Sequence, residues 1–335
     1  MLRRSALRNQ AANRASVVLG CVALVAALSG CGGQETATEE TVEVETTEVE
    51  SASTCAPINA VTGFYPLQFI ADRVGSDQTT VSVLAGPGVE AHDLELTPSQ
   101  AAEVTDADVV VYLPTFMPSV DEAVAELNSS AGLDVMAGLT LLEGEADDHD
   151  HGDSHDDEGK EEGEMIVDPH VWLDPTNVSA IASTLANKLG ELDPACSVIY
   201  TDNASALTDE MTALDSEMTA ALANCEVKTM VVSHEAFGYL ANRYGFEQVG
   251  ISGLTPEAEP SPNRLAEVAE ISKSDGVTTV YYETLVSPVV AETLATELDI
   301  EAAKLDPLES KPEGGDLVSQ MRANLETLVK GQNCG

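Results

Sequence analysis

Basic side chains are scarce in this chain of 335 residues: 15 lysines and arginines stand against 58 aspartates and glutamates, and the formal net charge is −43. Phosphate groups of nucleic acids and anionic lipid headgroups repel such a protein, which argues against both as partners. Cations, by contrast, are concentrated near an acidic surface. The composition therefore directs attention to cationic ligands.

Aromatic residues are also few, at 4% of the chain, whereas aliphatic residues and alanine are common. This composition is typical of helices packed on parallel strands and argues against a β-sandwich. The chain is long enough for two domains of ordinary size, each with its own core.

Two motifs of zinc proteins are missing. No cysteine pair has the C-x-x-C spacing of a thiolate zinc site, and no H-E-x-x-H motif of a metalloprotease occurs. The sequence therefore argues against a thiolate zinc site and against a metalloprotease of this type.

Long apolar runs are absent except near the N-terminus, where four arginines precede an apolar stretch over 17–28. This stretch is too short to span a bilayer stably and ends in small residues, so residues 1–30 are predicted to be a secretory signal peptide. The sequence Leu-Ser-Gly-Cys that ends at Cys31 resembles a bacterial lipobox, which implies that Cys31 is acylated. Residues 31–54, rich in glutamate and threonine, are predicted to form a disordered acidic tether.

From residue 55 onward, short β-branched runs alternate with segments of helical periodicity. This alternation predicts an α/β fold with parallel sheets built from βα units. We expect strands at 58–62, 79–84, 108–113, 138–142, 227–232, 246–251, 277–282 and 300–304, and helices at 66–75, 119–128 and 315–330.

Two helices are predicted in the middle of the chain. Asp174 is expected to cap the first helix, with Pro175 at its first position. The second, 193–224, has periodic apolar residues and no internal glycine, and at ~1.5 Å per residue it would span about 45 Å. Because that is too long for an ordinary crossover, we interpret it as a rigid helix joining an N-terminal lobe, 55–192, to a C-terminal lobe, 225–335.

The composition changes abruptly at 147–164, which is almost entirely acid, glycine and histidine. A segment without core-forming side chains is predicted to be a surface loop of the N-terminal lobe. Its histidines, His149, His151 and His155, together with the carboxylates, indicate an auxiliary site that collects metal weakly. The alternative is a solvated acidic insertion without a metal-binding role.

Three further histidines lie on connections that follow strands. His170 stands between two Asp-Pro pairs in MIVDPHVWLDP, His92 lies in PGVEAHDLELTP, and His234 lies in VVSHEAFGYLANRYG. Asp306 in LDPLE also follows a strand. Ligands of open α/β sheets bind beyond the carboxyl ends of the strands, so we expect these side chains in a cleft between the two lobes.

These segments together resemble the zinc-binding lipoproteins that serve bacterial ABC importers of zinc and manganese. The resemblance runs from Val61 to Leu328, with FYPLQFIADRVG, GISGLTPEAEPSPNRLAEV and YYETLVSPVVAETLATE as further landmarks. It implies two βα lobes joined by a long helix, with Zn(II) bound in the cleft as the transported ligand. It also implies a monomeric receptor without enzyme activity, held by lipid on the extracytoplasmic face of the bacterial cell membrane, that delivers zinc to a permease and its ATPase.

The resemblance implies the ligands as well. His92, His170 and His234 match the three histidines of the family, and Asp306 matches its carboxylate. Manganese-binding members carry a glutamate in the place of His234, so the histidine favours zinc, which nitrogen ligands serve better.

Several carboxylates near these ligands have roles that the sequence leaves open. Glu90 or water is an alternative to Asp306 as fourth ligand. Asp168 and Glu235 flank histidines and are candidates to orient the imidazoles through hydrogen bonds. Glu259 and Glu283 lie in family-like segments, but chemistry alone gives them no role.

Three other functions compete with a zinc receptor. A manganese-binding homologue and a surface adhesin or storage protein would use the same fold. A zinc hydrolase is the alternative from another class, because three histidines with an open fourth position also hold catalytic zinc. Against the hydrolase, a carboxylate is available to close the site.

Four cysteines of the exported part can form two disulfides. Strands of a parallel sheet all start at one edge, so Cys55 and Cys225 precede strands at the bottom of their lobes. The helices before Cys196 and Cys334 return to the same ends. We therefore predict the pairs Cys55–Cys196 and Cys225–Cys334.

Overall fold

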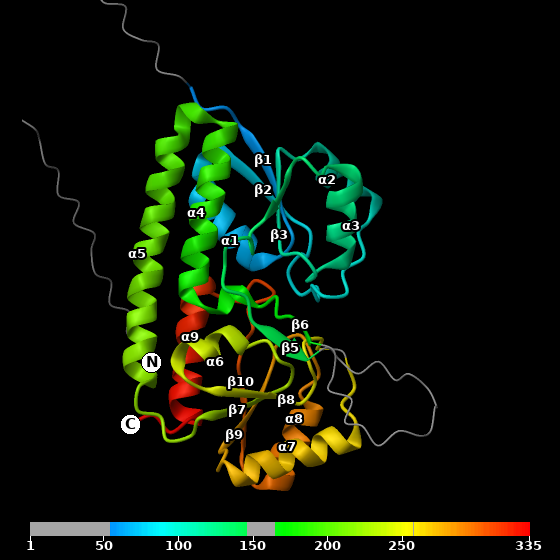
Figure 1. Cartoon of the computed structure of the whole chain (residues 1–335), viewed down its shortest axis with the longest axis vertical. Helices are drawn as coiled ribbons and strands as arrows, with labels where there is room; N and C mark the ends of the chain where they lie inside the picture. The colour runs from blue at the N-terminus through cyan, green and yellow to red at the C-terminus, as the bar shows by residue number, and fades with distance from the viewer. Residues whose placement is uncertain (1–53, 146–164, 257) are drawn as a thin grey trace, which may run out of the picture. The chain divides into compact units, whose positions relative to one another are not determined.

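The computed structural model describes residues 54–145, 165–256 and 258–335 (Figure 1). The predicted signal peptide, the lipidation site Cys31, nearly all of the tether and the acidic loop with His149, His151 and His155 lie outside these residues. Among the residues that the structure describes, no helix is long and apolar enough to cross a membrane.

The first sheet contains four parallel strands in the order β2-β1-β3-β4. β-branched side chains dominate its central strands, and β3, with the sequence VVVY, is almost wholly buried. The elements of this part are β1 (Ile58–Thr62), α1 (Tyr65–Gly75), β2 (Thr79–Val83), α2 (Pro98–Asp106), β3 (Val109–Tyr112), α3 (Pro118–Leu127) and β4 (Gly132–Asp134).

The second sheet repeats this plan with four parallel strands in the order β10-β9-β7-β8. Its elements are β7 (Thr229–Val232), α6 (Gly238–Tyr244), β8 (Glu247–Gly250), α7 (Pro262–Ser274), β9 (Thr279–Tyr282), α8 (Val289–Leu298), β10 (Glu301–Lys304) and α9 (Leu317–Gly331). The prediction of two parallel βα lobes is thereby confirmed.

The strand predicted at 138–142 is wrong. β4 completes the first sheet earlier in the chain, and β5 (Glu143–Glu145) pairs with β6 (Met165–Val167) as a small antiparallel ladder. Between β4 and β5 the chain turns, with a hydrogen bond from the Leu139 N–H to the Met136 carbonyl and with Gly138 at φ 89°. Glycine adopts this left-handed conformation at little cost, but the conformation does not fit a β-strand.

Two long helices, α4 (Pro175–Leu192) and α5 (Ser197–Leu222), run side by side (Figure 1). The capping prediction is confirmed, because the Asp174 side chain accepts a hydrogen bond from the Thr176 N–H at 2.7 Å. Helix α5 starts later than predicted, because a short 3-10 turn over Pro194–Cys196 separates it from α4.

Helix α5 contacts helices of both lobes. Towards the first sheet, Glu210 forms an ion pair with Arg73 of α1 at 2.7 Å. Towards the second, Glu217 pairs with Arg322 of α9 at 2.9 Å. A single buried apolar cluster continues from the first sheet through α4 and α5 to Val232 of β7. The long helix thus connects the lobes as expected, whereas the domain boundaries at 192 and 225 remain a prediction.

Two disulfides join the pairs of cysteines that the sequence analysis predicts. Cys55, just before β1, is bonded to Cys196 at the α4–α5 turn, and their Cα atoms are 5.5 Å apart. Cys225, before β7, is bonded to Cys334, after α9. Each disulfide ties the segment before the first strand of a sheet to a helix end.

Candidate metal site

His170 lies on the connection between β6 and α4 and is completely buried. Asp168 holds it from two sides, because the carboxylate Oδ1 lies 2.9 Å from the His170 backbone nitrogen and 2.8 Å from its Nδ1. When Nδ1–H donates to a carboxylate, the neutral imidazole carries its lone pair on Nε2. A histidine oriented in this way is typical of metal sites in proteins.

His234 follows β7 and is equally buried. Its Nδ1 lies 2.6 Å from Oε1 of Glu283, which directly follows β9. Glu283, which has no role in the sequence analysis, therefore orients His234. Glu235, considered for such a role, lies 3.6 Å from the guanidinium of Arg264.

His92 lies on the connection between β2 and α2 and is the most exposed of the three, with a side chain 10% accessible. Its ring packs edge-on against Phe116, with the ring centroids 4.5 Å apart. Its backbone N–H donates to Oε1 of Glu90 at 3.0 Å, so Glu90 contacts the His92 main chain.

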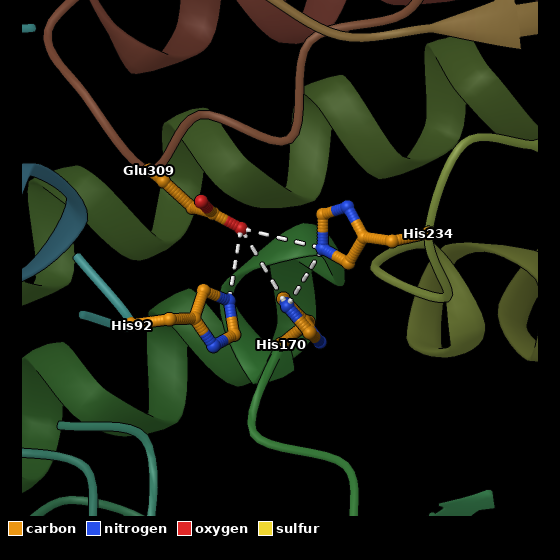
Figure 2. Close-up of side chains that lie close together, drawn as sticks. All are labelled: His92, His170, His234 and Glu309. Atoms are coloured by element: carbon orange, nitrogen blue, oxygen red, sulfur yellow. Dashed lines mark hydrogen bonds and ion pairs between the residues drawn. The ribbon is translucent and has the colours of Figure 1, made fainter. Parts of the chain in front are cut away.

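The carboxylate that meets these three histidines belongs to Glu309, on the loop between β10 and α9 (Figure 2). Its Oε1 lies 3.5 Å from Nε2 of His92 and 3.6 Å from Nε2 of both His170 and His234. The Nε2 atoms of His170 and His234 are 3.4 Å apart, and all four ligand atoms lie within 4.8 Å of one another. In a tetrahedral zinc site with bonds of about 2.0–2.2 Å, neighbouring ligand atoms are roughly 3.3–3.6 Å apart. The four distances of Glu309 to the histidines and of His170 to His234 match this separation.

Asp306, the predicted fourth ligand, does not join the three histidines. Its Oδ1 accepts from the Leu308 N–H and its Oδ2 accepts from the Thr284 hydroxyl, both at 2.9 Å. The carboxylate thus folds back over its own turn, and Glu309, three residues further on, reaches the histidines instead. The signal was present in the sequence, since the motif LDPLE contains both acids.

The three histidines and Glu309, which we call the cluster, carry charges that stabilise one another. Burial by itself raises the pKa of the Glu309 carboxyl, but the three nearby imidazoles outweigh burial and hold this pKa well below its ordinary value. Burial lowers the pKa of His234, but Glu283 and Glu309 outweigh it and raise this pKa well above 6.5. Burial also lowers the pKa of His170, but Asp168 and Glu309 outweigh burial, so this pKa is raised above 6.5.

Two ligand atoms, Nε2 of His92 and Oε1 of Glu309, are buried without a hydrogen-bond partner. An unsatisfied buried polar group costs about 1–3 kcal/mol, so proteins rarely keep one without a function. A cation at the centre of the cluster would contact both atoms. The donor set therefore fits a dication that accepts three nitrogens and one oxygen.

A cavity of about 560 Å³ opens beside the cluster. Glu309 of the cluster and Glu283, the partner of His234, line this cavity, and Pro87 and Gly88 of the first lobe contribute to its wall. The Gly88 N–H also donates to the hydroxyl of Ser310 in the second lobe at 2.8 Å.

Comparison with known proteins identifies the family. The sequence profile of the family described as "Zinc-uptake complex component A periplasmic" matches residues 60–331. The zinc-binding lipoprotein AdcA of Streptococcus pneumoniae serotype 4 is 34% identical over 288 residues, which are 81% of this chain and 55% of AdcA. The high-affinity zinc uptake system protein ZnuA of Bacillus subtilis is 32% identical over 321 residues, which are 93% of this chain and 95% of ZnuA.

Solved structures of similar proteins support the same family assignment. The Zn(II)-bound ZnuA-like domain of S. pneumoniae AdcA superimposes with a TM-score of 0.67 at 31% identity, over 83% of this chain and 100% of that domain. The laminin-binding protein Lbp of Streptococcus pyogenes gives a TM-score of 0.70 at 32% identity, over 82% of this chain and 99% of Lbp. The chain spans about half the length of the AdcA proteins it matches. With a family profile that covers most of the folded part, this chain belongs to the family of zinc-uptake complex component A.

Proposed function

We propose that this protein is an extracytoplasmic receptor that captures Zn(II) with His92, His170, His234 and Glu309 and delivers it to the permease of an ABC importer. The observation that carries the proposal is the convergence of three buried Nε2 atoms on one buried carboxylate oxygen. Two ligands follow elements of the first lobe and two follow strands of the second, so the ion would join the lobes.

The donor set favours binding over catalysis and zinc over manganese. Catalytic zinc keeps an open coordination position, whereas Glu309 occupies the fourth corner of this cluster. Three imidazoles suit zinc, whereas manganese prefers oxygen ligands. We therefore propose a transported ligand and no enzyme activity.

Zinc titration tests this function directly. We expect one equivalent of zinc to bind tightly and to raise the melting temperature, because a ligand present at 100 times its dissociation constant stabilises the folded state by about 2.7 kcal/mol. Trp172 is the only tryptophan, and its ring centroid lies 5.2 Å from that of His170, so its fluorescence should report the same event. Magnesium serves as a control cation, and a melting temperature that zinc leaves unchanged would refute the receptor function.

The lipid anchor is the second part of the proposal. The lipobox-like sequence before Cys31 supports it, and the S. pneumoniae relative is named a lipoprotein. We expect Cys31→Ala to release the protein from membranes or to leave an uncleaved precursor, as measured by fractionation of the cells that express it. Cys21→Ala, a matched change inside the predicted signal peptide, should leave the protein attached, and attachment of the Cys31 variant would contradict the anchor.

An adhesin is the second candidate, because three of the similar structures are of laminin-binding proteins of streptococci. One of them is described as bifunctional, with adhesin and metal-transporting activity. Binding of the zinc-loaded protein to immobilised laminin tests this candidate. Genes for a permease and an ATPase beside that of the receptor would support import.

A further inference from the structure

Glu309 is presented by a short segment without regular structure, Leu305–Glu309, which we name the ligand arm. All five residues of this arm are buried, although it lies on a connection between a strand and a helix. A buried connection must find hydrogen-bond partners for its backbone, and those partners determine its conformation. The contacts of the arm therefore decide where Glu309 lies.

The side chain of Asp306 stabilises the turn of the arm at Leu308. Its Oδ1 accepts from the Leu308 N–H at 2.9 Å, and Leu308 has φ 65°. A bulky residue rarely adopts this left-handed conformation, which persists only where the surroundings enforce it. The Asp306 carboxylate supplies part of that enforcement, directly before the ligand.

The main chain of the arm is held by two further side chains. Asn324 of α9 donates to the Asp306 carbonyl at 2.6 Å and accepts from the Asp306 N–H at 3.1 Å. The indole N–H of Trp172, two residues after His170, donates to the Pro307 carbonyl at 2.7 Å. The arm is thus anchored to α9 and to the segment that carries His170.

The other oxygen of Asp306 connects the arm to the support of His234. Its Oδ2 accepts from the hydroxyl of Thr284, which directly follows Glu283, the hydrogen-bond partner of His234. One carboxylate therefore links the segments that position two of the four ligands. Asp306 also lines the cavity beside Glu309, so water can reach this position when the arm is released.

We propose that Asp306 is a positioning residue of the metal site: it does not bind the ion, but it fixes the ligand arm so that Glu309 completes the tetrahedron. The inference rests on the proposed zinc site. It predicts that Asp306 acts on zinc affinity through Glu309 and not independently of it.

A double-mutant cycle tests the inference by zinc titration of the full chain. We expect Asp306→Ala to weaken zinc binding about 10–100-fold, as the loss of residues that support metal ligands does. Asp306→Asn keeps the oxygen that accepts from Leu308, so it should recover most of the affinity. In the Glu309→Ala background, Asp306→Ala should cost almost nothing more, since coupled residues are not additive.

A matched control separates an effect on the position of Glu309 from a general loss of stability. Asp193 is also a buried aspartate, which accepts hydrogen bonds from the Ala56 N–H and from the Tyr200 hydroxyl. Asp193→Ala should lower the melting temperature and leave zinc affinity unchanged. If Asp306→Ala does not fold, Thr284→Val, which removes one hydrogen bond of Asp306, takes its place in the cycle with a smaller expected loss.

The outcomes are distinct. Equal losses from the Asp306 or Thr284 change with and without Glu309 would overturn the positioning role, as would an Asp306→Ala variant with the affinity of the unmodified protein. Failure of the unmodified protein to bind zinc would instead refute the proposed function.

Discussion

Replacing His234 with alanine is expected to weaken zinc binding by more than about 100-fold, because changes to the supports of metal ligands alone cost about 10–100-fold. His234 is completely buried, and Glu283 already holds its ring with Nε2 towards the cluster. The alanine variant loses a preorganised ligand and leaves the Glu283 carboxylate without this partner. Calorimetric titration with a competing chelator at neutral pH measures the loss.

The control for this experiment makes the same chemical change elsewhere. His155→Ala, in the acidic segment 147–164, should leave the tight site unchanged. Zinc binding by the His234 variant at the affinity of the unmodified protein would show that the cluster is not the zinc site. The preference for zinc that depends on this histidine would then also lose its support.

Zinc affinity is expected to fall steeply as the pH is lowered, and the fall should begin above pH 6.5. Imidazole must be neutral to bind zinc, and its unperturbed pKa is about 6.5. In the metal-free protein the pKa of His170 is raised and that of His234 is raised well above 6.5, so protons compete with zinc at higher pH. Where both imidazoles are protonated, each displaced proton costs about tenfold in affinity per pH unit, or about 100-fold together.

Titrations between pH 5.5 and 8 in buffers of different ionisation enthalpy measure both the affinity and the protons released. The pKa of Glu309 is held well below its ordinary value, so this carboxylate stays ionised across the range and does not contribute to the fall. An affinity that is constant between pH 8 and 6 would contradict the assignment of His170 and His234 as ligands.

The same shifts predict the opposite trend for the metal-free protein. Groups whose pKa is raised on folding stabilise the folded state most below their unfolded pKa, and this stability is lost as the pH rises through the folded pKa. His170 and His234 should therefore stabilise the metal-free protein more at pH 6 than at pH 8. The increase in melting temperature that zinc causes should accordingly become smaller as the pH falls.

Local sequence was sufficient for the lobes and for three of the four cluster residues. The β-branched runs at 229–232 and 279–282 become buried parallel strands, and Asp174 caps the helix that Pro175 begins. Such features depend on near neighbours in the chain, so patterns of a few residues predict them. His92 and His234 follow parallel strands, whose carboxyl ends meet at one edge of a sheet. His170 was identified by its motif between two Asp-Pro pairs, which resembles the family.

The tertiary structure decided which carboxylate completes the site. Asp306 and Glu309 stand in one motif, and composition or spacing cannot separate them. The choice depends on Thr284, Asn324 and Trp172, which hold the ligand arm from three distant parts of the chain. Hydrogen bonds between residues so far apart in sequence have no local signature, which is why the sequence alone predicted a carboxylate in LDPLE but not the one that reaches the histidines.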